Sequence, residues 1–513
     1  MIRLDGENLT LADLQAIADL GAPVALAPAA AAAVDAARAV VDRHADGDAP
    51  VYGVNTGFGS LAEVRIARSA LDELQRNLLR SHAAGVDVPL PARAVRAMMA
   101  LRANALAKGF SGIRRDTLDL LIAALNARVH PIVPSRGSVG ASGDLAPLAH
   151  LSLVLIGEGH ATVGDDPSTV DGAAALAGAG LAPVTLGPKE GLALINGTQA
   201  STAVAALAVL GAERLARAAD LAAALTIDGL RGSYHPFEAR LHAPRPHPGQ
   251  QRSAANLLAL LQDSAINRSH ENCGRVQDAY SMRCAPQVHG AARDACAYAR
   301  AAIEIEMNAA TDNPMVFADV DTAGPGAGDI VSGGNFHGAP VAIAADLLVL
   351  GLVQLATISE RRSDRLVNPA LSGLAPFLTR DSGLHSGYML AQVTAAALTS
   401  ELKTLAHPAS ADTIPTSANR EDHVSMSMAA ALKAERALTL ATRVIAIEVL
   451  LACQAIDLLA PLTTSPALAP VHARVRSDVA TLAGDRPPSP DIESIAALIS
   501  SGSLERSCAS EVK

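Results

Sequence analysis

The feature that most constrains the fold of this chain is a run of small and branched apolar residues at helical spacing. Within residues 386–407, intervals of four and three alternate along Ala391, Ala395, Leu398, Leu402 and Leu405. A second seam of this kind follows at Ala437, Leu440, Val444, Ile447 and Leu451. This is the spacing of a heptad seam, and small seam residues let helices approach closely. We therefore expect long antiparallel helices packed as a bundle.

The composition supports a helical core. Hydrophobic residues make up 50% of the 513 positions, yet aromatic residues make up only 2% and there is no Trp. Such a core consists of Ala, Leu and Val, which suits packed helices better than a β-sandwich. Up to about residue 190, short helical patterns alternate with Gly/Pro-rich loops, and long helical patterns follow. The sequence predicts a mainly α fold, with a smaller mixed N-terminal part over 1–190 and a long helical bundle over 191–513 that ends in short helices.

Charge and cysteine usage limit the partners. The formal net charge of −10 disfavours nucleic acid and anionic membranes as partners. Five cysteines without a Cys-x-x-Cys pair indicate a reducing compartment, with neither a disulfide framework nor a metal site. We expect a cytoplasmic protein. The most apolar segment, 341–358, contains Asp346 and Gln354, so a buried bundle helix is favoured over a membrane span.

Residues 140–150, GASGDLAPLAH, carry the most distinctive chemistry. If this segment bends tightly, the nitrogen of Gly143 can attack the carbonyl carbon of Ala141. Loss of water from the ring and from Ser142 then leaves a methylidene electrophile on an imidazolone. Glycine supplies an unhindered nitrogen in a strained turn. Two alternatives fit less well, because a phosphate-binding loop lacks its Lys-Ser/Thr here and a hydrolase nucleophile lacks its Gly-x-Ser-x-Gly elbow.

The same segment resembles the cofactor-forming loop of the aromatic amino acid ammonia-lyases and 2,3-aminomutases. The likeness extends from about Val51 almost to the end of the chain. It implies 4-methylidene-imidazole-5-one as the cofactor, formed from Ala141, Ser142 and Gly143 without a metal. It also implies a catalytic base, Tyr52, in the lid-like stretch VYGVNTGFG. A tyrosine titrates near ~10 in water, so this role requires a stabilised anion; a lone Tyr in such a loop is otherwise a surface anchor.

Further site residues follow from the resemblance. In residues 275–287, Arg283 is expected to bind the substrate carboxylate through its guanidinium fork. Tyr280 is expected to assist the chemistry and Gln277 to line the pocket. The family supplies these residues from a different subunit than the cofactor, which implies a homotetramer with shared active sites. Asn196 matches a cofactor-supporting amide and Phe336 a pocket wall, although Asn-Gly also reads as a turn.

Substrate choice is expected to depend on two positions. His82 can hydrogen-bond an imidazole nitrogen, and the Glu421 carboxylate suits an imidazole N–H but not a bare phenyl ring. Together they favour L-histidine as substrate, with trans-urocanate and ammonia as products. Arg420 departs from the Gln that many histidine-specific members carry before this glutamate. The alternatives are a tyrosine or phenylalanine lyase, an aminomutase, and a non-catalytic helical homologue; a fumarase-type lyase lacks its Gly-Ser-Ser loop here.

Overall fold

The computed structural model describes residues 1–59, 63–271, 273–318, 328–508 and 512. Its internal contacts divide the chain into two compact units. Unit 1 consists of Met1–Leu207, Arg300–Ala345 and Pro408–Leu432, and unit 2 of Ala208–Ala299, Asp346–His407 and Lys433–Lys513. Each unit combines separate stretches of sequence. The expected division into 1–190 and 191–513 is one of two continuous stretches of sequence, and it stays a prediction.

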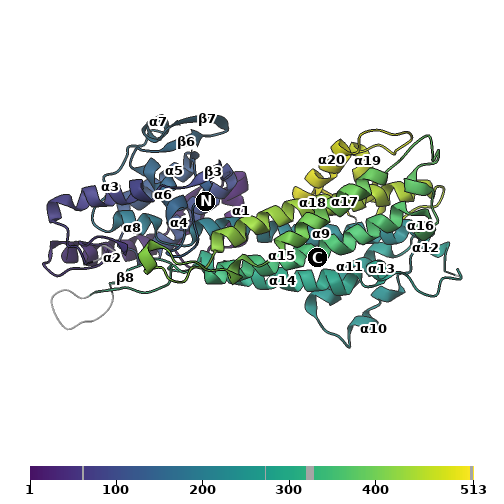
Figure 1. Ribbon diagram of the computed structural model, residues 1–513, viewed down its shortest axis with the longest axis horizontal. Helices are drawn as coiled ribbons and strands as arrows, with labels where there is room; N and C mark the ends of the chain where they lie inside the picture. Colours follow the sequence, from purple (N-terminus) through teal and green to yellow (C-terminus); the bar gives the residue numbers. More distant parts are fainter. Residues whose placement is uncertain (60–62, 272, 319–327, 509–511, 513) are drawn as a thin grey trace. The chain divides into compact units, whose positions relative to one another are not determined.

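Unit 1 combines short helices with small sheets (Figure 1). Its helices are α1 (Leu11–Leu20), α2 (Pro28–Asp46), α3 (Leu71–His82), α4 (Ala92–Ala107), α5 (Arg115–Asn126), α6 (Leu145–Leu155), α7 (Gly172–Gly178) and α8 (Glu190–Ile195). In the sheets, β1 (Ile2–Leu4) pairs in parallel with β2 (Val24–Leu26), and the other pairs are antiparallel. These are β3 (Val86–Pro89) with β5 (Pro134–Arg136), β6 (His160–Val163) with both β4 (Val129–Pro131) and β7 (Asp166–Asp171), and β8 (Met315–Phe317) with β9 (Asp329–Val331).

Unit 2 is built from long helices. Four of them have one end in unit 1, namely α9 (Gln199–Gly229), α14 (Ala285–Met307), α15 (Ala339–Val367) and α18 (Ser427–Leu458), whereas α17 (Met389–Leu405) lies within unit 2. Shorter helices complete the unit: α10 (Ala239–His242), α11 (Pro248–Leu261), α12 (Ala265–Arg268), α13 (Tyr280–Arg283), α16 (Pro369–Ser372), α19 (Ala469–Asp478), α20 (Ser489–Ser500) and α21 (Ser503–Arg506).

Small residues hold the helices of unit 2 close together. A Cβ atom on Gly211 of α9 would lie 2.3 Å from the Leu438 Cδ2 atom of α18, so any larger residue there would require the Leu438 side chain to move. The seam of α18 is fully buried, and that of α17 is buried at Ala391, Ala395 and Leu402. The expectation of a mainly α fold with a long helical bundle is confirmed.

Two helices, α15 and α18, are long and apolar enough to cross a membrane by length and composition alone. In the structure, 72% of the apolar window of α15 and 89% of that of α18 are buried inside the protein. Core helices of large bundles pass the same test, so this is weak evidence for a membrane span.

Candidate active site

Unit 1 contains a cavity of about 470 Å³ that brings together polar residues from distant parts of the sequence. Tyr52, Ala141, Ser142, Asn196, Phe336 and Glu421, all singled out from the sequence, line it. The remaining lining residues are Gly59, Asn313, Ser332, Gly333, His337, Ser417, Arg420, Asp422 and His423. The roles expected for these residues stay predictions, but the cavity places them within reach of one small molecule.

The turn before α6 demands glycine. Gly143 has a φ of +71°, and a Cβ atom there would lie 2.2 Å from the carbonyl oxygen of Gly197. The same oxygen accepts a hydrogen bond of 2.7 Å from the nitrogen of Asp144. The backbone at 143 is therefore pressed against the Asn196–Gly197 segment, in a conformation that a side chain would disrupt.

A buried carboxylate fixes the end of this turn. Asp144 is fully buried and accepts hydrogen bonds from the Ser138 hydroxyl at 2.8 Å and from both the nitrogen and the hydroxyl of Ser201, at 2.7 and 2.8 Å. Burial raises the pKa of Asp144, although these hydrogen bonds act to lower it. The two Ser201 donors tie the turn to the start of α9, and Ser138 ties it to the preceding loop.

Glu421 joins the turn to a distant loop. Its Oε1 atom accepts a hydrogen bond of 2.7 Å from the Ser142 hydroxyl, and its Oε2 atom accepts one of 2.6 Å from the Thr416 hydroxyl. Residues 416 and 421 also form an isolated antiparallel bridge, which sets the direction of the Glu421 side chain. Both carboxylate oxygens thus have hydroxyl donors, and one donor is the serine of the candidate electrophile.

Asn196 presents a buried amide oxygen that has no donor among the described residues. Its backbone oxygen accepts a hydrogen bond of 2.9 Å from Nη1 of Arg102, which also donates to Gln199 at 2.7 Å. Arg102 is fully buried, and burial lowers its pKa to about 10. The side-chain Oδ1 of Asn196 is buried with no hydrogen-bond donor among the described residues. A buried amide oxygen that lines a cavity and lacks a donor is a group that a ligand or cofactor can satisfy.

Tyr52 lies far from these groups in the sequence but lines the same cavity. Its hydroxyl oxygen accepts a hydrogen bond of 3.4 Å from the nitrogen of Gly59. Burial raises the pKa of the Tyr52 phenol, and the negative charge of Glu421 raises it further, against the effect of the Gly59 hydrogen bond. The phenol is consequently protonated at neutral pH in this arrangement.

His82, the last residue of α3, is held in one tautomer. Its Nδ1 atom lies 2.9 Å from the Leu78 carbonyl oxygen, so we assign the proton to Nδ1 and leave Nε2 as an acceptor. Burial lowers the pKa of His82 and so favours the neutral ring, whereas the Leu78 hydrogen bond and the charge of Glu421 act to raise the pKa. His82 is not among the residues that line the cavity, although the charge of Glu421 acts on it.

Gln277, Tyr280 and Arg283 belong to unit 2 and do not line the cavity of unit 1. Gln277 lines a separate polar cavity of about 230 Å³. The Tyr280 side chain is 69% exposed, and the guanidinium carbon of Arg283 lies 4.6 Å from the centre of its ring. The Arg283 Nε atom is buried without an acceptor in the part of the chain that the structure describes.

Sequence reasoning missed several polar residues of the cavity, among them His337, His423 and Asn313. The rings of His337 and His423 stack with centres 5.7 Å apart, and the two residues are joined by the contact of His337 Nε2 with the His423 carbonyl oxygen at 3.2 Å. Asn313 accepts a hydrogen bond of 2.7 Å from the nitrogen of Gly333. His337 and His423 lie within two residues of Phe336 and Glu421, so proximity to those positions was an available signal; Asn313 carried none.

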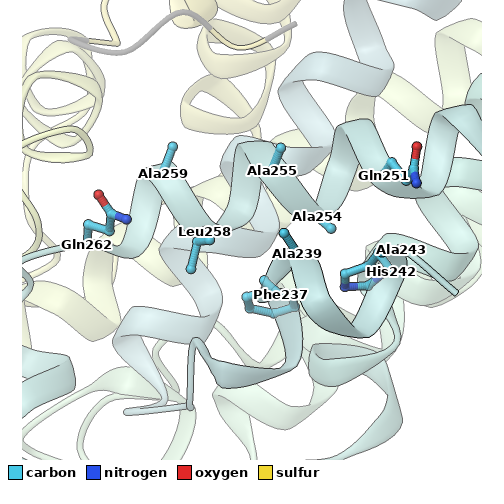
Figure 2. Close-up of a pocket in the computed structure, with 10 residues that line it drawn as sticks. All are labelled: Phe237, Ala239, His242, Ala243, Gln251, Ala254, Ala255, Leu258, Ala259 and Gln262. Atoms are coloured by element: carbon cyan, nitrogen blue, oxygen red, sulfur yellow. The ribbon is translucent and has the colours of Figure 1, made fainter. Parts of the chain in front are cut away.

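A third cavity, also in unit 2, offers no comparable chemistry (Figure 2). It has a volume of about 330 Å³ and is lined mainly by alanines of α10 and α11 together with Phe237 and Leu258. Both ring nitrogens of its histidine, His242, have partners at 3.0 Å, namely the Pro236 carbonyl and the Gln250 amide. Among the described residues, no group of three or more His, Cys, Asp or Glu could hold a metal ion.

The cavity of unit 1 can be compared with known proteins. The sequence profile described as aromatic amino acid lyase matches residues 9–477. The chain belongs to the aromatic amino acid lyase family. The resemblance seen in residues 140–150 is thereby confirmed, and the chain is an enzyme of the ammonia-lyase type.

Individual relatives of this family match over nearly the full length. The chain is 57% identical to a histidine ammonia-lyase of Anaeromyxobacter sp. (strain K), over 98% of this chain and 99% of the relative. A histidine ammonia-lyase from Trypanosoma cruzi has a solved structure with a TM-score of 0.91 and 44% identity, covering 99% of this chain and 94% of that one. A tyrosine aminomutase from Streptomyces globisporus reaches a TM-score of 0.92 at 38% identity, covering 100% and 99%.

Proposed function

We propose that this enzyme is a histidine ammonia-lyase, which eliminates ammonia from L-histidine without oxidation and releases trans-urocanate. The observation that carries the proposal is the position of Glu421, a carboxylate that lines the cavity beside Ser142. A carboxylate facing a phenyl ring would lose hydration without gaining a partner, whereas an imidazole N–H offers it a hydrogen bond. The relatives named histidine ammonia-lyase support the same substrate.

His82 complements Glu421 in this proposal. Its neutral ring presents Nε2 as an acceptor, because Nδ1 faces the Leu78 carbonyl. A protonated imidazole ring of the substrate has two N–H donors, one for the Glu421 carboxylate and one for Nε2 of His82. Two polar groups at the ring are what discrimination against phenylalanine and tyrosine requires, since a site built for hydrogen bonds rejects ligands that leave its groups unpaired.

The residues around the turn fit the 4-methylidene-imidazole-5-one group that we propose to form from Ala141, Ser142 and Gly143. The left-handed backbone at Gly143 and its packing against Gly197 supply the required tight bend. The group has a carbonyl oxygen and an imine nitrogen but no N–H, so the unpartnered Oδ1 of Asn196 is left for a donor of the substrate, such as its ammonium. When formed, the group would provide the electrophile that makes an amine a better leaving group.

The side chains of the cavity then have separate tasks. Tyr52 would take the β-proton of the substrate, which requires the loss of its own proton against the burial and the Glu421 charge that raise its pKa. The Tyr52 anion therefore needs a nearby cation to stabilise it. We assign Arg283 to a different group, the substrate carboxylate, because its Nε atom lacks an acceptor within the described chain. Tyr280, under its guanidinium, would assist beside it, and Phe336 would form the wall of the ring pocket.

We further propose a homotetramer in which Gln277, Tyr280 and Arg283 of one subunit serve the cavity of another. The exposed faces of the long helices support an oligomer. Tyr298 and Ile305 of α14 are 52% and 72% exposed, and Ile343 and Leu350 of α15 are 52% and 47% exposed. Each pair is seven residues apart and shares one helix face, which a partner subunit can cover.

A cytoplasmic location is part of the same proposal. Cys273, Cys284, Cys296 and Cys453 carry free thiols, which a reducing compartment preserves.

The deciding experiment follows the absorbance of urocanate after L-histidine is added to the purified protein, with L-tyrosine and L-phenylalanine in parallel. We expect product from histidine alone. Ser142→Ala is the control for the electrophile, because it should fold, retain the mass of two waters per chain that the wild type loses, and be inactive. Product from another amino acid, or a β-amino acid in place of ammonia, would overturn the substrate or the reaction.

A further inference from the structure

A pair of fully buried charges lies against α13, the single-turn helix that carries Tyr280 and Arg283. Arg362 of α15 and Glu448 of α18 are both completely inaccessible to solvent. The Nε atom of Arg362 donates to Oε1 of Glu448 at 2.5 Å, and Nη2 donates to Oε2 at 2.9 Å. This is the two-pronged arrangement that gives an arginine–carboxylate pair its defined geometry.

The remaining guanidinium nitrogen of Arg362 reaches α13 itself. Nη1 donates a hydrogen bond of 3.2 Å to the carbonyl oxygen of Ser281, which lies between Tyr280 and Arg283 in the sequence. A single-turn helix has few hydrogen bonds of its own, and α13 has no side-chain cap at its start. The direction of its two functional side chains therefore depends on contacts from outside the helix.

Behind the pair lies a second buried layer that fixes the plane of the Arg362 guanidinium. The Nδ1 atom of His289 donates to Asp220 at 2.7 Å, and its Nε2 atom lies 3.4 Å from Nη1 and Nη2 of Arg362. Although burial alone would raise it, Arg293 and His289 lower the pKa of Asp220 to about 2. Burial lowers the pKa of His289 despite the Asp220 carboxylate, so the ring is neutral and Nε2 can accept.

Stability does not explain why these charges are buried. Replacing a buried ion pair by apolar residues of similar volume is commonly neutral or stabilising, because the charges lose their hydration. What apolar residues cannot supply is a rigid N–H directed at the Ser281 carbonyl. The ordered chain from Asp220 through His289 and Arg362 to Glu448 supplies that donor in one orientation.

We propose that Arg362 and Glu448 are positioning residues for the substrate carboxylate, because they hold the backbone of α13 so that Arg283 and Tyr280 face the substrate. The inference depends on the proposed function in one respect, the assignment of Arg283 to the carboxylate. It predicts that the pair matters for ligands that carry a carboxylate and little for ligands that lack one.

The test is a double variant, Arg362→Met with Glu448→Leu, which removes both charges together and leaves neither unpaired. The matched control is Asp346→Leu with Lys433→Met, which removes a buried pair from the same two helices, where the Lys433 ammonium lies 2.5 Å from the Asp346 carboxylate. We expect both proteins to fold, as judged by their thermal midpoints. A second variant, Arg362→Lys, keeps the charge but lacks the fork that reaches Glu448 and Ser281 together.

Binding of trans-urocanate, which has a carboxylate, and of histamine, which has none, is measured by calorimetry on the holoenzyme alongside kcat and KM. For the double variant and for Arg362→Lys, we expect the Kd of urocanate and the KM of histidine to rise about tenfold, equivalent to about 1.4 kcal/mol. The Kd of histamine should stay within about twofold of the wild-type value. In the control variant, the Kd of both urocanate and histamine should stay at the wild-type value. Equal effects on both ligands, or none on urocanate, would overturn the proposal.

The wild type separates this outcome from a failure of the proposed function. If the wild type acts on a different aromatic amino acid, the substrate assignment fails. The carboxylate product of that amino acid and its decarboxylated amine then replace urocanate and histamine, and the comparison between variants still decides the role of the pair.

Discussion

Replacement of Glu421 by glutamine is the sharpest test of how this enzyme recognises its substrate. In the structure, Glu421 accepts hydrogen bonds from the hydroxyls of Ser142 and Thr416 at 2.7 and 2.6 Å. Glutamine keeps one acceptor oxygen, and its amide can donate to the other hydroxyl, so the cost to folding is expected to stay within about 1 kcal/mol. What the substitution removes is the negative charge.

The effect on catalysis has two parts. A hydrogen bond to a charged group contributes about 1.5–3 kcal/mol and a neutral one about 0.5–1.5 kcal/mol, so the imidazole loses on the order of 1–2 kcal/mol of binding, or about tenfold. If the carboxylate also handles a proton in the reaction, general acid–base catalysis adds a factor of about 10² or more. We expect kcat/KM for histidine to fall at least about hundredfold.

The assay compares initial rates of urocanate formation for the wild type, Glu421→Gln and Thr416→Val. Thr416→Val is the matched control, because it removes one hydrogen bond to the carboxylate and keeps its charge, and should cost less than about tenfold. Thermal midpoints and intact masses of the three proteins establish that each folds and loses the same two waters. Unchanged kinetics in Glu421→Gln, or an equal loss in the control, would refute the reasoning.

Three further predictions concern the turn, the base and the pH dependence of stability. Gly143→Ala should lower the thermal midpoint by several degrees and abolish activity, because a left-handed backbone costs about 1–2 kcal/mol and the new Cβ atom would lie 2.2 Å from the Gly197 oxygen. Since burial and Glu421 raise the pKa of Tyr52, kcat/KM of the wild type should rise with pH above neutrality, and Tyr52→Phe should lose that rise and about 10²-fold or more in rate. Burial, reinforced by Arg96 and Arg128, lowers the pKa of His130 from 6.5 to about 4, so the unfolded chain binds the extra proton between these values. Its contribution to stability is complete above pH 6.5 and is lost as the pH falls towards 4, and His130→Asn should flatten that part of the plot of thermal midpoint against pH.

The parts of the fold that sequence predicts well are those with a local signature. The seam from Ala437 to Leu451 repeats within a single helix, so its burial in α18 follows from periodicity alone. The helix expected over 386–407 is found as α17, Met389–Leu405, and ends before Pro408 as proline chemistry requires. Such local patterns can be recognised without knowing which distant residues pack against them.

The candidate site depends on contacts that no local pattern contains. Ser142 and Glu421 are 279 positions apart, and nothing in the spacing of either segment indicates that their side chains meet. Asn313 reaches the same cavity from a stretch without a recognised motif. The Arg362–Glu448 pair is equally hidden in the sequence, because Glu448 reads as one polar position on an apolar helix and Arg362 as one of several charges in residues 360–365. Only the folded chain shows that these groups converge.

The hydrogen bond between Ser142 and Glu421 also connects the proposed electrophile with the proposed substrate specificity. In the chain as translated, Oε1 of Glu421 accepts from the Ser142 hydroxyl. Formation of the proposed group removes that hydroxyl as water, and Oε1 then loses its donor while Oε2 keeps the Thr416 hydroxyl. A carboxylate oxygen without a donor in a cavity costs free energy until a ligand supplies an N–H. The same dehydration that would create the electrophile would thus leave an acceptor for the imidazole of the substrate, held in place by Thr416.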